Sequence, residues 1–255
     1  ALNNRSQSNL KGNFSNLDIS KLIALQGGSL IPVEGETTGT VDLNFPGTNF
    51  RNASGTLNAA IIANAGTADR GLIPVNGNVR LNATDGLFNV DLADLNTARS
   101  KLTATGRFDL RDENSDLNVA LRSADATEID RLVRVMDLLP TLEEQLNSLE
   151  VQVAGNLNFD GTVKGNLTDP TVNGKASLDS FMVRGRELGN ITTDVFVSPM
   201  GVELKNGKLA DRTGGNAEFA VNIPRGGSNN VTVKATLNRV NAGNLLAALP
   251  ITLPE

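Results

Sequence analysis

Acidic side chains gather in two places where their spacing suits chemistry. The first cluster runs from Asp109 through Asp112, Glu113 and Asn114 to Asp116. Carboxylate and amide oxygens are the ligands that Ca²⁺ takes, but this run lacks the glycine and the terminal glutamate of an EF-hand loop. We therefore interpret it as the solvated tip of a hairpin.

The second cluster comprises Asp125, Glu128 and Asp130. Paired carboxylates can serve as general acid and base. Here Asp125 and Glu128 have the spacing of a capping box, in which the first residue accepts amide hydrogens of a starting helix. Asp130 then falls on the wet face of that helix, so we expect no catalytic site here.

Four residue types are missing: the chain of 255 residues has no Cys, His, Trp or Tyr. Their absence removes thiolate and imidazole catalysis and the usual zinc ligands. The net charge of -5 argues against a nucleic-acid surface, which needs clustered Lys and Arg. We expect a protein that is not an enzyme and has no metal, no cofactor and no nucleic-acid partner.

Period-two alternation is the main structural signal. Apolar residues alternate with Asn, Thr, Asp, Lys or Arg, the pattern of a strand with one dry and one wet side. Turn residues such as Asp85-Gly86 separate the runs and indicate consecutive hairpins. The clearest runs are Val75–Leu81, Leu102–Leu110, Leu117–Leu121, Val151–Phe159, Ile191–Val197, Ala217–Ile223 and Val231–Leu237.

Helical spacing replaces the alternation only between residues 125 and 149, where apolar residues recur at three and four. Pro140 predicts a break between two short helices. Weak matches at offsets of about 115 residues indicate two repeats. We expect a first β unit over 1–133 ending in a short helix, and a second unit over 134–255 that begins with the second helix.

The apolar strand faces permit two interpretations. One is the closed core of a sandwich or barrel, and the other is an apolar groove open to a lipid chain. Periodicity does not separate them because both need one dry face. The residues alone favour the plain core.

A family resemblance shifts that balance. The stretch Gly165-Asn-Leu-Thr-Asp-Pro170-Thr-Val-Asn-Gly174-Lys-Ala-Ser-Leu178 resembles the recurring G-x-L-x-x-P-x-x-x-G-x-L-x-L run of the AsmA-like proteins, which include the TamB translocation and assembly proteins. Ala176 departs from the pattern, which has Leu there. The element Leu17-Asp-Ile-Ser-Lys-Leu22 resembles the unit-closing D-L-S-x-L of the same family.

The resemblance implies a long antiparallel sheet curled into a taco-like groove with an apolar interior. It also implies a periplasmic location between the two membranes of a diderm bacterium, with an inner-membrane anchor on the full-length protein. The implied partners are phospholipids or other acyl-chain ligands, an outer-membrane assembly protein of the Omp85 type, and neighbouring segments of a longer chain.

We accordingly expect a passive, non-enzymatic lipid conduit whose lining is aliphatic and Phe-rich. The rivals are a closed-core β-sandwich or solenoid that binds or adheres through its loops, and an enzyme that uses carboxylates. The expected lining residues are Val79, Leu81, Phe88, Val90, Phe108, Leu110, Val119, Val153, Leu157, Phe159, Val195, Phe219, Val221 and Val233.

Overall fold

The computed structural model describes residues 6–18, 33–64, 72–135, 150–166, 169–212, 214–225 and 231–239. The second predicted helix, after Pro140, lies outside this part of the chain. The chain divides into two units, Ala1–Ala120 with Thr162–Pro170, and Leu121–Gly161 with Thr171–Glu255. The boundary expected between residues 133 and 134 concerns sequence repeats and stays a prediction.

The described residues of unit 1 form strands and one turn of 3-10 helix, η1 (Phe50–Asn52). The last residues of its final strand belong to unit 2. The strands are β1 (Gln7–Asp18), β2 (Val33–Glu34), β3 (Glu36–Pro46), β4 (Ser54–Ile62), β5 (Ile73–Pro74), β6 (Asn76–Thr84), β7 (Leu87–Asn96), β8 (Ser100–Asp109) and β9 (Asn114–Ser123).

Unit 2 holds α2 (Ala126–Val135), which is the only α-helix among the described residues. Its other described elements are strands, and the end of the first of them belongs to unit 1. They are β10 (Val151–Gly165), β11 (Thr171–Val183), β12 (Arg186–Ser198), β13 (Gly201–Ala210), β14 (Asn216–Pro224) and β15 (Thr232–Asn238).

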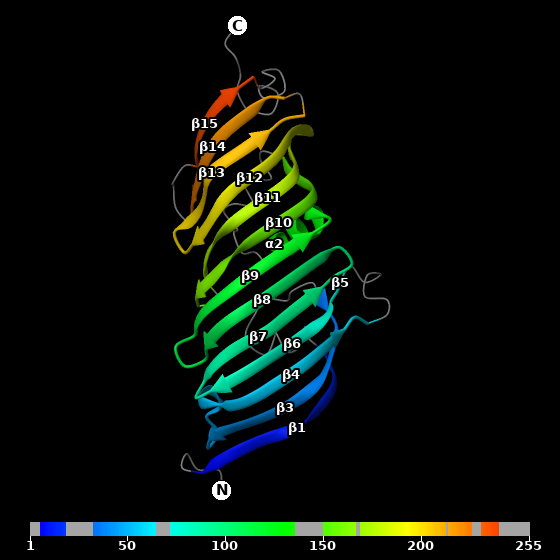
Figure 1. Cartoon of the computed structure of the whole chain (residues 1–255), viewed down its shortest axis with the longest axis vertical. Coiled ribbons are helices and arrows are strands. Elements are labelled where there is room, and N and C mark those ends of the chain that lie inside the picture. Colours follow the sequence, from blue (N-terminus) through cyan, green and yellow to red (C-terminus); the bar gives the residue numbers. More distant parts are fainter. Residues whose placement is uncertain are drawn as a thin grey trace. The chain divides into compact units, whose positions relative to one another are not determined.

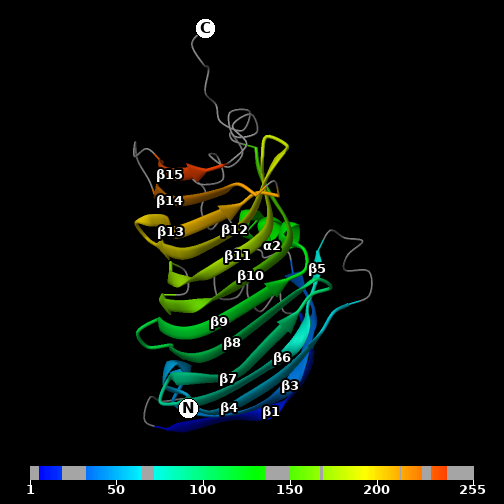
Figure 2. The same ribbon diagram turned by 45° about the horizontal axis from the view of Figure 1, so that its top comes forward.

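Hydrogen bonds join 13 strands into one antiparallel sheet in the order β1-β3-β4-β6-β7-β8-β9-β10-β11-β12-β13-β14-β15 (Figure 1). The sheet is not closed, because β1 and β15 stand at opposite ends of this order. Within each unit the strands are bent along their length (Figure 2). The prediction of a mostly β fold built on an antiparallel sheet is confirmed.

Two-residue turns explain why neighbouring strands pair in sequence order. Asp85 and Gly86, between β6 and β7, have φ values of 47° and 81°. Arg184 and Gly185, between β11 and β12, have φ values of 49° and 68°. Two positive φ values in succession make the tight turn whose twist matches that of the flanking strands. The hairpin predicted at Asp85-Gly86 is confirmed.

The start of α2 also follows the sequence. The Asp125 carboxylate accepts hydrogen bonds from the Thr127 backbone amide at 3.1 Å and from the Thr127 hydroxyl at 2.6 Å. This satisfies an amide of the first turn that has no partner within the helix. Ala126, the first helical residue, is fully buried. The predicted cap is therefore present, and Asp125 is a structural residue.

A small closed core forms at one end of unit 1. Ala53, Ala83 and Phe88 are buried there, and the rings of Phe88 and Phe108 stack with centroids 5.0 Å apart. The turn between β6 and β7 is fixed to η1 by a hydrogen bond from the Gly86 amide to the Ala53 carbonyl. The partly buried residues packed on this core are Leu43, Phe45, Leu81, Phe108 and Leu110.

A second buried patch comes from a pairing that the sequence pattern did not predict. Strands β2 and β5 pair in parallel, with Val33 opposite Ile73. Ile73 is 2% exposed, and Ile61 and Val75 are buried as well. Parallel pairing brings together segments far apart in the chain, so it leaves no local turn signal.

We predict that Phe88→Ala lowers the free energy of unfolding by about 3–5 kcal/mol, because it removes a buried ring and leaves a cavity beside Phe108. Phe50→Ala, at a ring 62% exposed, is the matched control. It should change stability by less than about 0.5 kcal/mol. Urea denaturation followed by circular dichroism measures both, and equal effects would contradict the closed core.

Candidate functional site

Cross-strand register gives each unit one apolar face and one polar face. Residues directly opposite each other in an antiparallel pair lie on the same side of the sheet. In unit 1 one side carries a row of aliphatic partners across β3, β4, β6 and β7, and we call this side the apolar face. The row comprises Val41, Leu57, Leu81 and Val90.

The expected lining residues of unit 1 lie in this sheet, except Leu110, and they differ in exposure. Phe88 is 7% exposed and Val90 is 8% exposed, so neither offers a free surface. Leu110 follows β8, and its amide donates to the Gly86 carbonyl. Together with Leu81 and Phe108, these residues belong to or border the closed end of the unit.

Val79 and Val119 lie away from that closed end and are half-buried. Val79 stands between Ala59 on β4 and Ala93 on β7. Each alanine extends only a methyl group above the sheet, so the side-chain layer of the apolar face is thinner around Val79. Val119 lies on β9, within a run that alternates as the sequence predicted.

Unit 2 carries an equivalent aliphatic row across β12 to β15. Direct pairing joins Val195 to Leu204, Leu204 to Val221, and Val221 to Val233. The first three are half-buried, and Val233 is 62% exposed. The structure thus places three of the expected lining residues, Val195, Val221 and Val233, in one continuous row.

Three further expected residues lie on β10. Leu157 and Phe159 share one side of this strand and are half-buried, while Val153 precedes an irregular position at Gly155, where φ is 75°. The Asn158 side chain, on the opposite side, donates to the Ser177 hydroxyl at 3.2 Å. The β10 strand therefore shows the same separation of apolar and polar sides.

Several apolar-face residues were not among those expected. The same alternation that selected their neighbours also marks them, so a complete count of one side of every strand would have found them. They are Val41, Leu43, Leu57, Val197, Val202, Leu204, Leu209 and Ile223.

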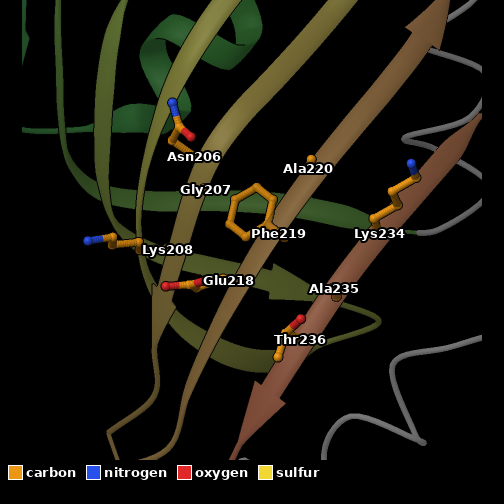
Figure 3. A pocket seen from close by; sticks show the side chains of 9 residues that line it. All are labelled: Asn206, Gly207, Lys208, Glu218, Phe219, Ala220, Lys234, Ala235 and Thr236. Carbon is orange, nitrogen blue, oxygen red and sulfur yellow. The ribbon is translucent and has the colours of Figure 1, made fainter.

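Phenylalanine rings cover glycines on three pairs of strands. Phe14 faces Gly39, and Phe219 faces Gly207. A methyl group built at Gly207 would overlap the Phe219 ring, which lies across β13 in Figure 3. Phe159 closes in the same way on Gly174, where a methyl group would stand 2.7 Å from the ring. Such pairs keep the rings flat on the sheet and protect the glycine backbone.

Shallow depressions lie along both units where these glycines occur. One of about 400 Å³ contains Gly207 and Lys234, one of about 260 Å³ contains Gly39 and Arg80, and one of about 390 Å³ contains Gly174 and Lys205. Each depression is lined mainly by residues of the polar face, and a basic side chain is among them. The lining of the first is shown in Figure 3.

The polar face carries ion pairs between exposed side chains. Lys11 donates to Asp42 at 2.6 Å, and Lys101 donates to Asp94 at 2.9 Å. These hydrogen bonds lower the pKa values of both carboxyl groups. Because both pairs are open to water, they set the charge pattern of the polar face and add little to stability.

Two arginines form ion pairs with the acidic cluster that follows β8. Arg111 donates to both oxygens of Asp109 and, at 3.2 Å, to Asp85. The Arg111 side chain and its backbone amide lower the pKa of Asp109 to about 2. Glu113 pairs with Arg51 at 3.3 Å. The cluster joins turns of unit 1, which fits the predicted hairpin tip.

The described residues contain no group of three or more acidic side chains that could hold a metal ion. None of the described helices has both the length and the hydropathy of a membrane-crossing helix. Comparison of the chain with protein-family models, with curated proteins and with solved structures gives no match.

We predict that Gly207→Ala destabilises the protein by about 1–3 kcal/mol, because the new methyl group must displace the Phe219 ring. Gly12→Ala is the matched control, since a methyl group on that β1 glycine would meet nothing within 4 Å. Thermal unfolding compares the two variants. A stability loss at Gly12 equal to that at Gly207 would contradict the role of ring contact.

Acid should weaken the Asp109–Arg111 contact. The pKa of Asp109 is depressed in the folded chain, so its stabilisation is complete above the ordinary value near 4 and is lost as the pH falls towards about 2. Asp109→Asn should therefore show a smaller fall in Tm than the parent between these pH values. Asp91→Asn, at an exposed carboxylate on β7, should show the parent's fall.

Proposed function

We propose that this chain is a non-enzymatic segment that carries or shields acyl chains on the apolar face of its sheet. The resemblance to AsmA-like and TamB proteins in Gly165–Leu178 supports a role in envelope biogenesis between the inner and outer membranes of a diderm bacterium. In that setting the ligand is a phospholipid or a related amphiphile.

The observation that carries the proposal is the aliphatic row of unit 2. Its members are half-buried or exposed, and the described strands of the unit all belong to a single sheet layer. An acyl chain lying on Val195, Leu204 and Val221 would leave water, at a gain of roughly 0.8 kcal/mol for each CH₂ fully buried. Because the row contains only aliphatic side chains, the chain could slide along it without meeting a strong specific site.

The closed end of unit 1 around Phe88 offers no such surface. Phe88 and Val90 are 7% and 8% exposed, and the rings of Phe88 and Phe108 stack, so these three residues act in packing.

Two other functions have some support. The same apolar face could shield a strand of an outer-membrane protein during assembly, in which case an Omp85-type assembly protein is the partner. The closed core around Phe88 favours the rival of a binding or adhesion domain that acts through its loops. Ion pairing of Asp109 and capping by Asp125 leave the carboxylate-enzyme hypothesis with the weakest support.

We predict that Val221→Asp lowers the affinity for a fluorescent long-chain fatty acid at least about tenfold, a loss of about 1.4 kcal/mol, because a carboxylate then interrupts the row. Asn222→Asp is the matched control: it adds the same group to the adjacent residue of β14, on the polar face. Its affinity should stay within about twofold of the parent.

Fluorescence titration measures the affinities, and circular dichroism checks the fold. If Val221→Asp fails to fold, Val221→Thr keeps the shape of the side chain and should still weaken binding. Native mass spectrometry of the protein purified from a diderm host should reveal a bound amphiphile. Absence of both fatty-acid binding and co-purified lipid would refute the proposal.

A further inference from the structure

Strand β15 is an edge strand of the sheet that the described residues form. Among the described residues it has one neighbouring strand, β14, and all seven of its residues are exposed. Its register with β14 runs from Asn216–Asn238 to Asn222–Thr232 without an irregularity. A straight, exposed edge strand presents a row of amide and carbonyl groups that can pair with an added strand.

The opposite edge strand, β1, is less suited to pairing with an added strand. Strand β1 has an irregular register between Phe14 and Leu17, where Asn16 has a φ of 56°. Its lysine, Lys11, already pairs with Asp42 of the neighbouring strand. Irregular backbone and edge charges are the devices by which proteins prevent unwanted strand addition. The two edges of the sheet therefore differ in their readiness to accept a partner.

The side chains of β15 define the partner they would fit. Val233, at 62% exposure, and Leu237, at 47%, extend the apolar face to the edge. Lys234 lies between them on the polar face, opposite Ala220 of β14. Two other polar-face lysines stand opposite a carboxylate on the next strand, Lys175 opposite Asp194 and Lys208 opposite Glu218. At Lys234 that position is occupied by a methyl group.

We propose that β15 binds an extended peptide strand with apolar residues at alternate positions and an Asp or Glu facing Lys234. Main-chain hydrogen bonds to the edge would supply affinity. The apolar side chains would cover Val233 and Leu237, and the carboxylate would pair with Lys234 and fix the register. This interaction surface meets the acyl-chain row at Val233 but does not depend on lipid binding.

A second copy of this chain fits the edge less well. The single carboxylate of β1, Asp18, stands at the end of the strand, beyond the irregular position at Asn16, and the regular part of the strand presents Lys11 on its polar face. Strand β15 itself also has no acidic residue. Pairing of β15 with itself or with the regular part of β1 would therefore leave Lys234 without a carboxylate and add a second lysine nearby, and like charges across strands are destabilising.

The chain's own β3 supplies a suitable probe peptide. In β3, Asp42 faces Lys11, and Val41 and Leu43 flank it on the apolar side. A capped, fluorescein-labelled peptide with the sequence of Thr38–Pro46 can lie antiparallel to β15 with its Asp opposite Lys234. Its Val and Leu then face Ala235 and Val233.

Fluorescence anisotropy with the full chain tests the proposal. The peptide should bind, and the same peptide carrying Asp42→Lys should bind at least about tenfold more weakly. The protein variant Lys234→Glu should reverse this preference. Arg80→Glu, the same type of charge change on the interior strand β6, should leave it unchanged. Peptide binding should also slow hydrogen exchange of the amides of residues 232–238.

Each contrary result overturns the proposal. Failure of the Thr38–Pro46 peptide to bind would refute it, and so would a preference that Lys234→Glu does not reverse. Slowed exchange confined to β1 would place the binding edge elsewhere. Concentration-dependent dimerisation of the free protein that protects β15 would identify a second copy as the occupant instead.

Discussion

The cross-strand register of the apolar face is the constraint on which the rest of the structure depends. Side chains alternate between the two faces of a sheet, so a slip of one residue would move a whole set of aliphatic side chains into water. In β7 the apolar residues are at even-numbered positions, Phe88 and Val90, and then at odd-numbered positions, Ala93 and Leu95. This is a change of parity. One extra residue at Asp91 absorbs that change, because Leu81 pairs with Val90 while Arg80 pairs with Leu92.

The same device recurs in unit 2, and it shows how far the sequence predicts the sheet. Val202 and Leu204 share a face with Gly207 and Leu209, and the change of parity occurs at Asn206, where φ is 51°. Alternation predicted the strands, and Asp85-Gly86 predicted a hairpin. The bulges were not predicted, although the parity changes that mark them are visible in the sequence. Interruptions of alternation therefore carry information about where a strand bends.

Other parts of the structure depend on long-range contacts that leave no local pattern. The parallel pairing of β2 with β5 and the contact of η1 with the β6–β7 turn join distant segments. The alternation consequently predicted the same role, as lining residues, for Phe88 and Phe108 and for Val195 and Val221. The structure separates them by burial: the first pair stacks in a closed core, and the second pair lies half-buried in a row.

This separation shows that one alternating pattern can produce both closed packing and a partly exposed apolar surface. At the closed end of unit 1, Ala53 follows η1 and packs against Phe88, so apolar side chains there contact protein on both sides. In unit 2 the strands of the described chain form one layer, and the same side chains keep part of their surface free. The hydrophobic effect acts equally on both sets. A folded segment satisfies it in the first, and a bound apolar molecule would satisfy it in the second.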